Sequence, residues 1–112
     1  MISVRQIDDV TEVMFNNLKK LNILVSDDVK TEFDNFFEIP NLKLLVNMEG
    51  IEFIDSSGFA IFLSNIKRIQ KNNVQMIFCN VSNLAFDLFK VLHLHTVFKI
   101  IDCRTEALKS FE

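Results

Sequence analysis

The stretch of sequence that decides the fold is Ile54-Asp55-Ser56-Ser57-Gly58-Phe59. A strand is expected to end here and a helix to begin, because apolar residues recur at helical spacing from Phe59 onward. Asp55 or Ser56 is expected to cap that helix, since a short side-chain oxygen accepts hydrogen bonds from its first free N–H groups. Gly58 has no side chain and permits a close approach to the backbone. An exposed serine hydroxyl is therefore expected where N–H groups and the helix dipole favour an anion such as phosphate.

By itself, Asp-Ser-Ser-Gly is a generic turn and cap sequence, and caps are far commoner than phosphorylation sites. The surrounding sequence gives it a context, because strands and helices alternate on both sides of it. Strands are expected over Ile2–Val4, Val10–Phe15, Leu42–Met48, Val74–Val81 and Val97–Ile101, with a turn at Asp8-Asp9. Helices are expected from Ser26 to just before Pro40, from the decisive stretch to Ile69, from Ser82 or Asn83 to Leu92, and from Thr105 to Phe111.

The predicted helices carry start signals and apolar stripes. Ser26 is expected to be the N-cap of the first helix, with Asp27 and Asp28 in its first turn, where carboxylates suit the helix dipole. The residues expected to face inward are Phe59, Phe62, Leu63, Ile66 and Ile69 in the second helix and Leu84, Ala85, Leu88, Phe89 and Leu92 in the third. This alternation predicts a single α/β domain over residues 1–112, with a mixed, mostly parallel sheet of about four to five strands and about four α-helices.

Composition sets limits on function. With 112 residues, 49% of them apolar and 24% charged, the chain suits one ordered domain. A net charge of −3 disfavours nucleic acid as a partner, and the absence of a long apolar run excludes membrane insertion. The N-terminus shows no export signal, so the two cysteines are expected to be reduced thiols in a cytoplasmic protein. Twelve phenylalanines with no tryptophan or tyrosine indicate a core filled with rings that carry no polar group.

From about Leu42 to Ile101 the chain resembles the STAS domain, and specifically the bacterial anti-sigma factor antagonist family. The first forty residues are similar in pattern only. The resemblance rests on the strand Leu44–Met48, the stretch Ile54–Phe59, the helix through Ile66-Lys67, the strand Met76–Ser82 and the segment Leu88–Leu92.

The resemblance implies a switch in a circuit of exchanging partners. Family members are not enzymes and use no cofactor. When unphosphorylated, they bind an anti-sigma factor that is also a serine kinase, and this binding frees a sigma factor. The kinase phosphorylates the first serine after the aspartate, and a separate serine phosphatase reverses the modification. Carried onto this sequence, the phosphorylated residue is Ser56, while the formation of a homodimer is left open.

The same resemblance assigns partner-binding residues. Asp55 would orient the Ser56 hydroxyl, and Ser57 and Gly58 would belong to the docking surface. In the family, a loop that reads glycine, acidic, apolar, aspartate lies close to the phosphorylation site. Here that loop is Lys19-Lys20-Leu21-Asn22, which lacks the glycine and both acids. Lys20 and Asn22 are therefore expected at the partner surface, where Lys19 or Lys20 would screen a phosphate or suit an acidic partner.

Two apolar residues, Ile61 and Phe86, fall off the inward stripes of their helices and are candidate partner contacts, with Ile61 assigned to the partner-binding surface. Singly exposed apolar residues are also common without any function. His93 and His95 are expected to point to different faces of a helix end, which disfavours a metal site. Ser56 lacks the flanking glycines of a hydrolase nucleophile elbow.

Two other functional classes remain as alternatives. In the first alternative, the chain has the STAS fold but is not switched by phosphorylation. It would then be a scaffold subunit of a transporter ATPase or of a signalling assembly. The second is a small enzyme or nucleotide-binding domain, which is disfavoured because the sequence has no glycine-rich phosphate loop of the P-loop or Rossmann kind.

Overall fold

The computed structural model describes all residues, Met1–Glu112, and is built on a five-stranded sheet in the order β1-β2-β4-β6-β7. The strands are β1 Ile2–Ile7, β2 Val10–Phe15, β3 Lys20–Leu21, β4 Lys43–Asn47, β5 Phe53–Ile54, β6 Gln75–Cys79 and β7 Lys99–Ile101. The helices are α1 Ser26–Phe37, α2 Ser56–Leu63, α3 Ile66–Lys71, α4 Asn83–Val91 and α5 Arg104–Lys109, with a 3₁₀ helix, η1, at Leu94–Thr96.

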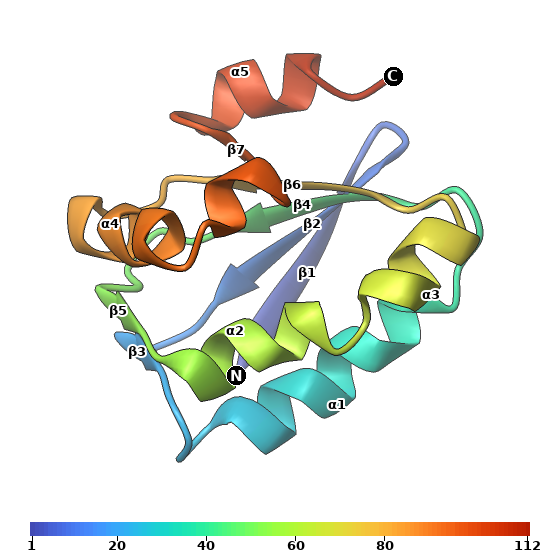
Figure 1. Cartoon of the computed structure of the whole chain (residues 1–112). Helices are drawn as coiled ribbons and strands as arrows, with labels where there is room; N and C mark the ends of the chain where they lie inside the picture. Colours follow the sequence, from blue (N-terminus) through green and yellow to red (C-terminus); the bar gives the residue numbers. More distant parts are fainter.

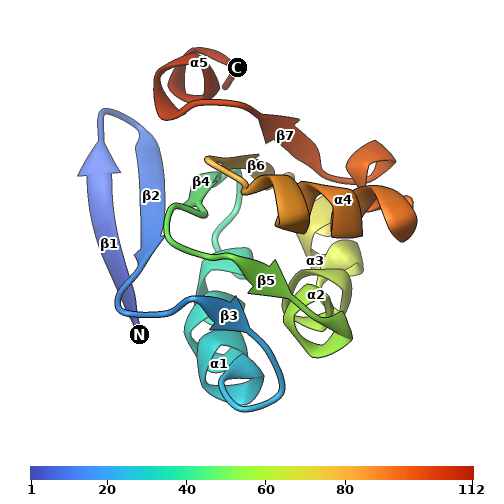
Figure 2. The ribbon, with the colours of Figure 1, turned by 90° about the vertical axis from the view of Figure 1, so that its left-hand side faces the viewer.

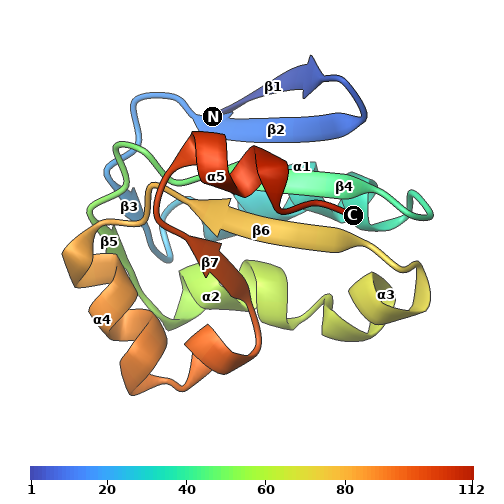
Figure 3. The same ribbon diagram turned by 90° about the horizontal axis from the view of Figure 1, so that it is seen from above.

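The sheet is mixed and mostly parallel, which confirms the predicted fold class. β1 and β2 form an antiparallel hairpin that turns at Asp8-Asp9, where Asp8 takes a positive φ of 53°. The pairs β2–β4, β4–β6 and β6–β7 are parallel, so each needs a crossover through helices. The carboxyl ends of β4 and β6 therefore point the same way, toward β5 and α4 (Figure 3).

Helices cover the sheet unequally, with α1 and α2 on one face and α5 on the other (Figures 1 and 2). The larger core lies on the α1 and α2 side, where six phenylalanines are almost completely buried: Phe33, Phe37, Phe59, Phe62, Phe78 and Phe89. Phe62 is central to it, with its ring centroid 5.1 Å from that of Phe33 and 5.0 Å from that of Phe78, both edge to face. The ring-filled core expected from the composition is confirmed.

A smaller core lies under α5. It comprises Val10, Leu45, Ile77, Cys79 and Ala107. Along the sheet, Glu12 of β2 pairs with Leu45 of β4, and Leu45 pairs with Ile77 of β6, so these three side chains share the α5 face. The C-terminal helix was predicted from Thr105 onward, and it begins one residue earlier, at Arg104.

The single helix predicted to run to Ile69 is divided into α2 and α3, so that prediction is wrong at Ser64 and Asn65. The buried Asn65 side chain donates to the Ile61 carbonyl at 2.9 Å and to Asp34 Oδ1 at 3.0 Å. A side chain that bonds the preceding turn competes with the helical backbone pattern and bends the chain.

Two further details of the helices differ from prediction. Ser26 is not an N-cap: it is the first residue of α1, Val25 occupies the cap position, and no side chain caps the helix. Asp27 and Asp28 do lie in the first turn. Three residues predicted to face inward are exposed instead: Leu63, Leu84 and Leu92.

Candidate functional site

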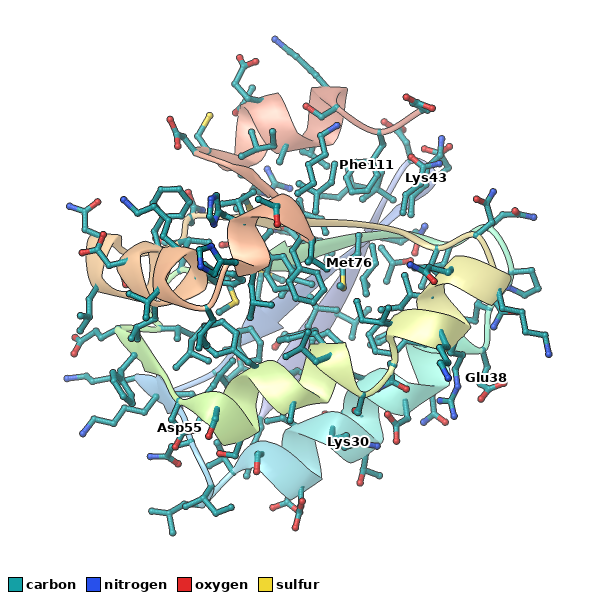
Figure 4. The ribbon with its side chains drawn as sticks, viewed as in Figure 1. Lys30, Glu38, Lys43, Asp55, Met76 and Phe111 are labelled. Atoms are coloured by element: carbon teal, nitrogen blue, oxygen red, sulfur yellow. The ribbon has the colours of Figure 1, made fainter.

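The N-terminus of α2 is held by Asp55, which confirms the prediction that Asp55 or Ser56 caps this helix. Asp55 Oδ1 accepts hydrogen bonds from the backbone N–H groups of Ser57 at 2.9 Å and Gly58 at 3.1 Å, and from the Ser57 hydroxyl. Figure 4 shows Asp55 at the start of α2. The cap uses the first free N–H groups of the helix and the hydroxyl of the second serine, but not that of the first.

These hydrogen bonds stabilise the ionised form of Asp55. The Ser57 hydroxyl, together with the backbone N–H groups of Gly58 and Ser57, holds the pKa of the Asp55 carboxyl below its usual value. Partial burial acts in the opposite direction and is outweighed. The site therefore carries a permanent negative charge at neutral pH, directly before Ser56 in the chain.

Ser56 is exposed, and its hydroxyl takes part in none of the hydrogen bonds around the cap. It follows Asp55 and precedes Ser57, whose hydroxyl donates to Asp55 Oδ1. Of the two adjacent serines, only the first presents a free hydroxyl to the surroundings. This is the chemical requirement for a residue that accepts a phosphoryl group.

Gly58 is buried, and its lack of a side chain lets another segment of the same chain pack against its backbone. A Cβ at this position would collide with the Leu21 carbonyl oxygen and lie 2.7 Å from Ile54 Cγ2. The close neighbour is β3, which pairs in parallel with β5 and accepts the Asp55 N–H at the Leu21 carbonyl, 3.2 Å away. The short β3–β5 ladder thus fixes the loop before α1 against the start of α2.

An open hollow of about 630 Å³ lies beside this point and is called the β5 hollow here. It is lined by Lys20, Asn22, Ile23, Leu24, Glu52, Phe53, Asp55 and Leu84. Ile23, Leu24 and Leu84 are 72%, 84% and 53% exposed, which is high for large apolar side chains. Such exposed apolar residues beside charged ones are typical of protein interaction surfaces.

The turn that carries Ile23 and Leu24 is well defined. Asn22 Oδ1 accepts from the Leu24 N–H at 3.1 Å, and the Asn22 carbonyl accepts from Val25 and Ser26. A second, smaller groove of about 200 Å³ runs between α1 and α2, and Ile23 and Ser57 both line it. Ser56 therefore lies between two residues, Asp55 and Ser57, that each border a different hollow.

The structure brings most of the predicted site residues together. Asp55, Lys20 and Asn22 line the β5 hollow, and Ser57 lines the groove between α1 and α2. Lys19 and Lys20 are exposed, and the Lys19 carbonyl accepts from the N–H groups of Glu52 and Phe53 at 2.7 Å and 3.2 Å.

The structure corrects the predicted orientation of Ile61. It is only 1% exposed, so the expectation of an outward side chain is wrong, because α1 packs beside α2 and covers that face. Phe86 is half-buried, with Lys90 Nζ 5.0 Å from its ring centroid.

Sequence reasoning missed the apolar residues Ile23, Leu24 and Leu84. Leu84 was assigned to an inward stripe, and Ile23-Leu24 sits in a short turn with no periodic pattern. The signal that points to the first two is their position: two apolar residues directly follow Lys19-Lys20-Leu21-Asn22, the loop already expected near the serine.

No group of three His, Cys, Asp or Glu side chains is arranged to hold a metal ion. His93 takes a left-handed conformation, and its ring centroid lies 6.5 Å from that of His95. Both cysteines are free, and burial raises the pKa of Cys79 to about 12, which makes it an unreactive thiol.

No helix reaches the length and apolar character needed to cross a bilayer.

A small α/β domain with a capped, serine-bearing strand-to-helix junction is the class that the fold and the site define. A model of the STAS domain family matches residues 1–107, and the chain belongs to that family. The match extends well beyond Leu42–Ile101, where the resemblance is clearest in the sequence, and includes β1, β2 and α1.

Solved structures share this fold. The chain is similar to an anti-sigma-factor antagonist (STAS) domain protein from Planctomyces limnophilus, with a TM-score of 0.90 and 24% identity over 98% of this chain and 97% of that one. The anti-sigma factor antagonist SpoIIAA, solved in its unphosphorylated form, gives a TM-score of 0.74 and 14% identity over 97% and 93%. The murine anion transporter Slc26a9 matches with a TM-score of 0.75 and 13% identity. The match covers 94% of this chain and 18% of the transporter.

Proposed function

We propose that this protein is an anti-sigma factor antagonist that binds an anti-sigma factor with serine kinase activity, and that phosphorylation of Ser56 ends this binding. The observation that carries the proposal is the free, exposed Ser56 hydroxyl at the start of α2, set beside a half-apolar hollow. A serine phosphatase would restore the binding-competent form. Membership of the STAS family and the likeness to antagonist structures support this assignment.

The local geometry supports a switch that changes the surface and leaves the fold intact. A phosphate adds about −1.5 to −2 charges. The N–H groups of Ser57 and Gly58 already donate to Asp55, so the new phosphate would find them occupied. The ionised Asp55 repels it as well. The phosphate is therefore expected to stay on the surface, where it would oppose a partner that fits a neutral hydroxyl.

The test uses the ATP-binding anti-sigma factors encoded by the source organism, each purified and incubated with this protein and labelled ATP. The expected result is incorporation of phosphate into the wild type and into Ser57→Ala, and none into Ser56→Ala. Ser57→Ala is the matched control, because it removes the neighbouring hydroxyl. Calorimetry on the same partner should show binding by Ser56→Ala and roughly hundredfold weaker binding by Ser56→Asp, a difference of about 3 kcal/mol.

The scaffold alternative has one observation in its favour, the occurrence of the same fold inside an anion transporter. It predicts no phosphate on Ser56 and equal partner affinity for the wild type, Ser56→Ala and Ser56→Asp. That combination of results would replace the switch with a constitutive interaction domain.

The lysines near the β5 hollow give a second test of the binding surface. Lys19 and Lys20 are exposed, and neither forms one of the ion pairs in the structure. The double charge reversal Lys19→Glu, Lys20→Glu is expected to lower the affinity for an acidic partner, most strongly at low salt, because exposed charges are screened as salt rises. Lys67→Glu, Lys71→Glu on α3 is the control. An affinity and a salt dependence equal to those of the wild type would exclude a role for the loop lysines.

A further inference from the structure

Glu12 on β2 is the one charged side chain that is completely buried, and it lies on the α5 face of the sheet. Its carboxylate receives three sets of donors. Arg104 Nε of α5 donates to Oε2 at 2.7 Å, and Asn47 Nδ2 of β4 donates to Oε2 at 3.1 Å. Arg5 Nη2 of β1 donates to Oε1 at 3.0 Å. A buried carboxylate keeps its charge only while such donors are in place, so their positions are tightly linked to one another.

Asn47, at the carboxyl end of β4, extends this network. Its Nδ2 group donates to Glu12, while its Oδ1 accepts from the Glu49 N–H at 3.1 Å and from Asn80 Nδ2 at 3.1 Å. Asn47 is only 4% exposed, so water offers its amide few alternatives. An unbroken set of hydrogen bonds therefore runs from Arg104 on α5 to the loop after β4 and to Asn80 at the end of β6.

The two loops reached by this network lead directly to the β5 hollow. The loop after β4 continues through Glu52 into β5, and the loop after β6 continues through Ser82 into α4. Ser82 Oγ donates to the Glu52 carbonyl at 3.3 Å and accepts from the N–H of Ala85, which ties the two loops together. Glu52 and Leu84, one from each side, line the hollow.

We propose that Glu12, Asn47 and Asn80 are positioning residues for the β5 hollow, and that Arg104 makes their arrangement depend on the docking of α5. The helix α5 lies on the opposite face of the sheet from α2 (Figures 1 and 2), so the network connects two separate surfaces of the molecule. Anything that displaces α5 removes the donor at 2.7 Å from Glu12 and loosens the two loops. Chains of hydrogen bonds are one physical route by which two distant sites can be coupled, and the coupling is tested by the variants below.

The experiment measures amide hydrogen exchange by NMR in the isolated full chain, so its outcome is independent of the proposed function. Arg104→Ala removes the hydrogen bond that α5 donates to Glu12, and Arg5→Ala is the matched control, because Arg5 bonds the same carboxylate from β1, away from both loops. Arg104→Ala is expected to speed exchange at Glu49 by about tenfold relative to the amides within β4 and β6. Arg5→Ala is expected to change that ratio by less than about twofold.

Two further variants separate positioning from general stabilisation. Arg104→Lys keeps a cation that can donate to Glu12 and should restore most of the protection at Glu49. Asn80→Ala breaks the network beyond Asn47 and should speed exchange in both loops while α5 keeps its own protection. The proposal is overturned if Arg104→Ala speeds exchange equally throughout the sheet, or if Arg5→Ala affects Glu49 as strongly as Arg104→Ala does.

Discussion

Gly58 shows how one residue determines the geometry of the site. The sequence suggested a surface that closely approaches the backbone at Gly58, and the structure identifies that surface as β3 of the same chain. A Cβ here would meet the Leu21 carbonyl oxygen and Ile54, both of which belong to ordered strands. Gly58→Ala is expected to destabilise the fold by about 1–3 kcal/mol through overpacking. Urea denaturation measures this cost.

Ser56→Ala is the matched control for that substitution, because Ser56 is exposed in the same turn of α2 and its hydroxyl is not bonded. Its free energy of unfolding should stay within about 0.5 kcal/mol of the wild type. Equal stability of Gly58→Ala and the wild type would show that β3 moves away from α2 at little cost.

Asp55 carries a second prediction at the residue scale. Its carboxylate satisfies the N–H groups of Ser57 and Gly58, which otherwise have no partner in the helix. Asp55→Ala is expected to cost about 1–2 kcal/mol, whereas Asp55→Asn, which retains a cap acceptor, should cost less. Thermal unfolding of the two variants checks the order. Equal losses in the two variants, which both lack the charge, would show that charge rather than capping governs the position.

At the scale of elements, the sequence predicted what periodicity and caps encode. Helix α2 and its cap at Asp55 were located because an apolar run, a carboxylate and a glycine occur together. The break after α2 was missed because it depends on Asn65 meeting Asp34, a residue 31 positions away in the sequence. The same reason hid the β3–β5 ladder, whose two-residue strands have no periodicity and form only once Lys20–Leu21 lies beside Phe53–Ile54.

The outward residues of α2 and α4 show the same limit. Helical spacing placed Leu84 inside and Ile61 outside, and both assignments are wrong. A stripe counted on an isolated helix assumes a single buried face, but α2 contacts the sheet on one side and α1 on another. Ile61 therefore faces a neighbour, and Leu84, in the first turn of α4, is exposed and lines the β5 hollow. Neither position follows from the period of one helix.

At the scale of the whole molecule, the phenylalanine core unites the helices with the sheet. The Phe62 ring of α2 meets Phe33 of α1 and Phe78 of β6 edge to face, and all three are almost completely buried. Phe62→Ala is expected to cost about 3–5 kcal/mol, a large part of the total stability of a typical domain. The half-buried Phe111 is the control, and Phe111→Ala should cost less than half as much in chemical denaturation. Comparable losses would mean that the core under α5 contributes as much as the larger one.

The dependence of stability on pH tests the buried network as a property of the whole fold. Burial alone would raise the pKa of Glu12, but hydrogen bonds from Arg104, Asn47 and Arg5 outweigh it and hold the pKa below the usual 4.5. The Ser57 hydroxyl and backbone N–H groups likewise lower the pKa of Asp55 from 3.8. The unfolded chain therefore binds these protons more readily than the folded protein, and protonation favours unfolding.

The contribution of both carboxylates is accordingly complete above their ordinary pKa values of 4.5 and 3.8, and it is lost as the pH falls through the lower values of the folded state. Melting temperatures measured from pH 7 downward should stay level and then fall steeply below about pH 4.5. Glu12→Gln is expected to be less stable at pH 7, because the amide carries no charge for the two arginines and replaces one acceptor oxygen with an NH2 group, and to show a shallower decline in acid. A decline as steep as that of the wild type would place the acid sensitivity in other carboxylates, such as Asp34 beside Lys30, whose lowered pKa acts in the same direction.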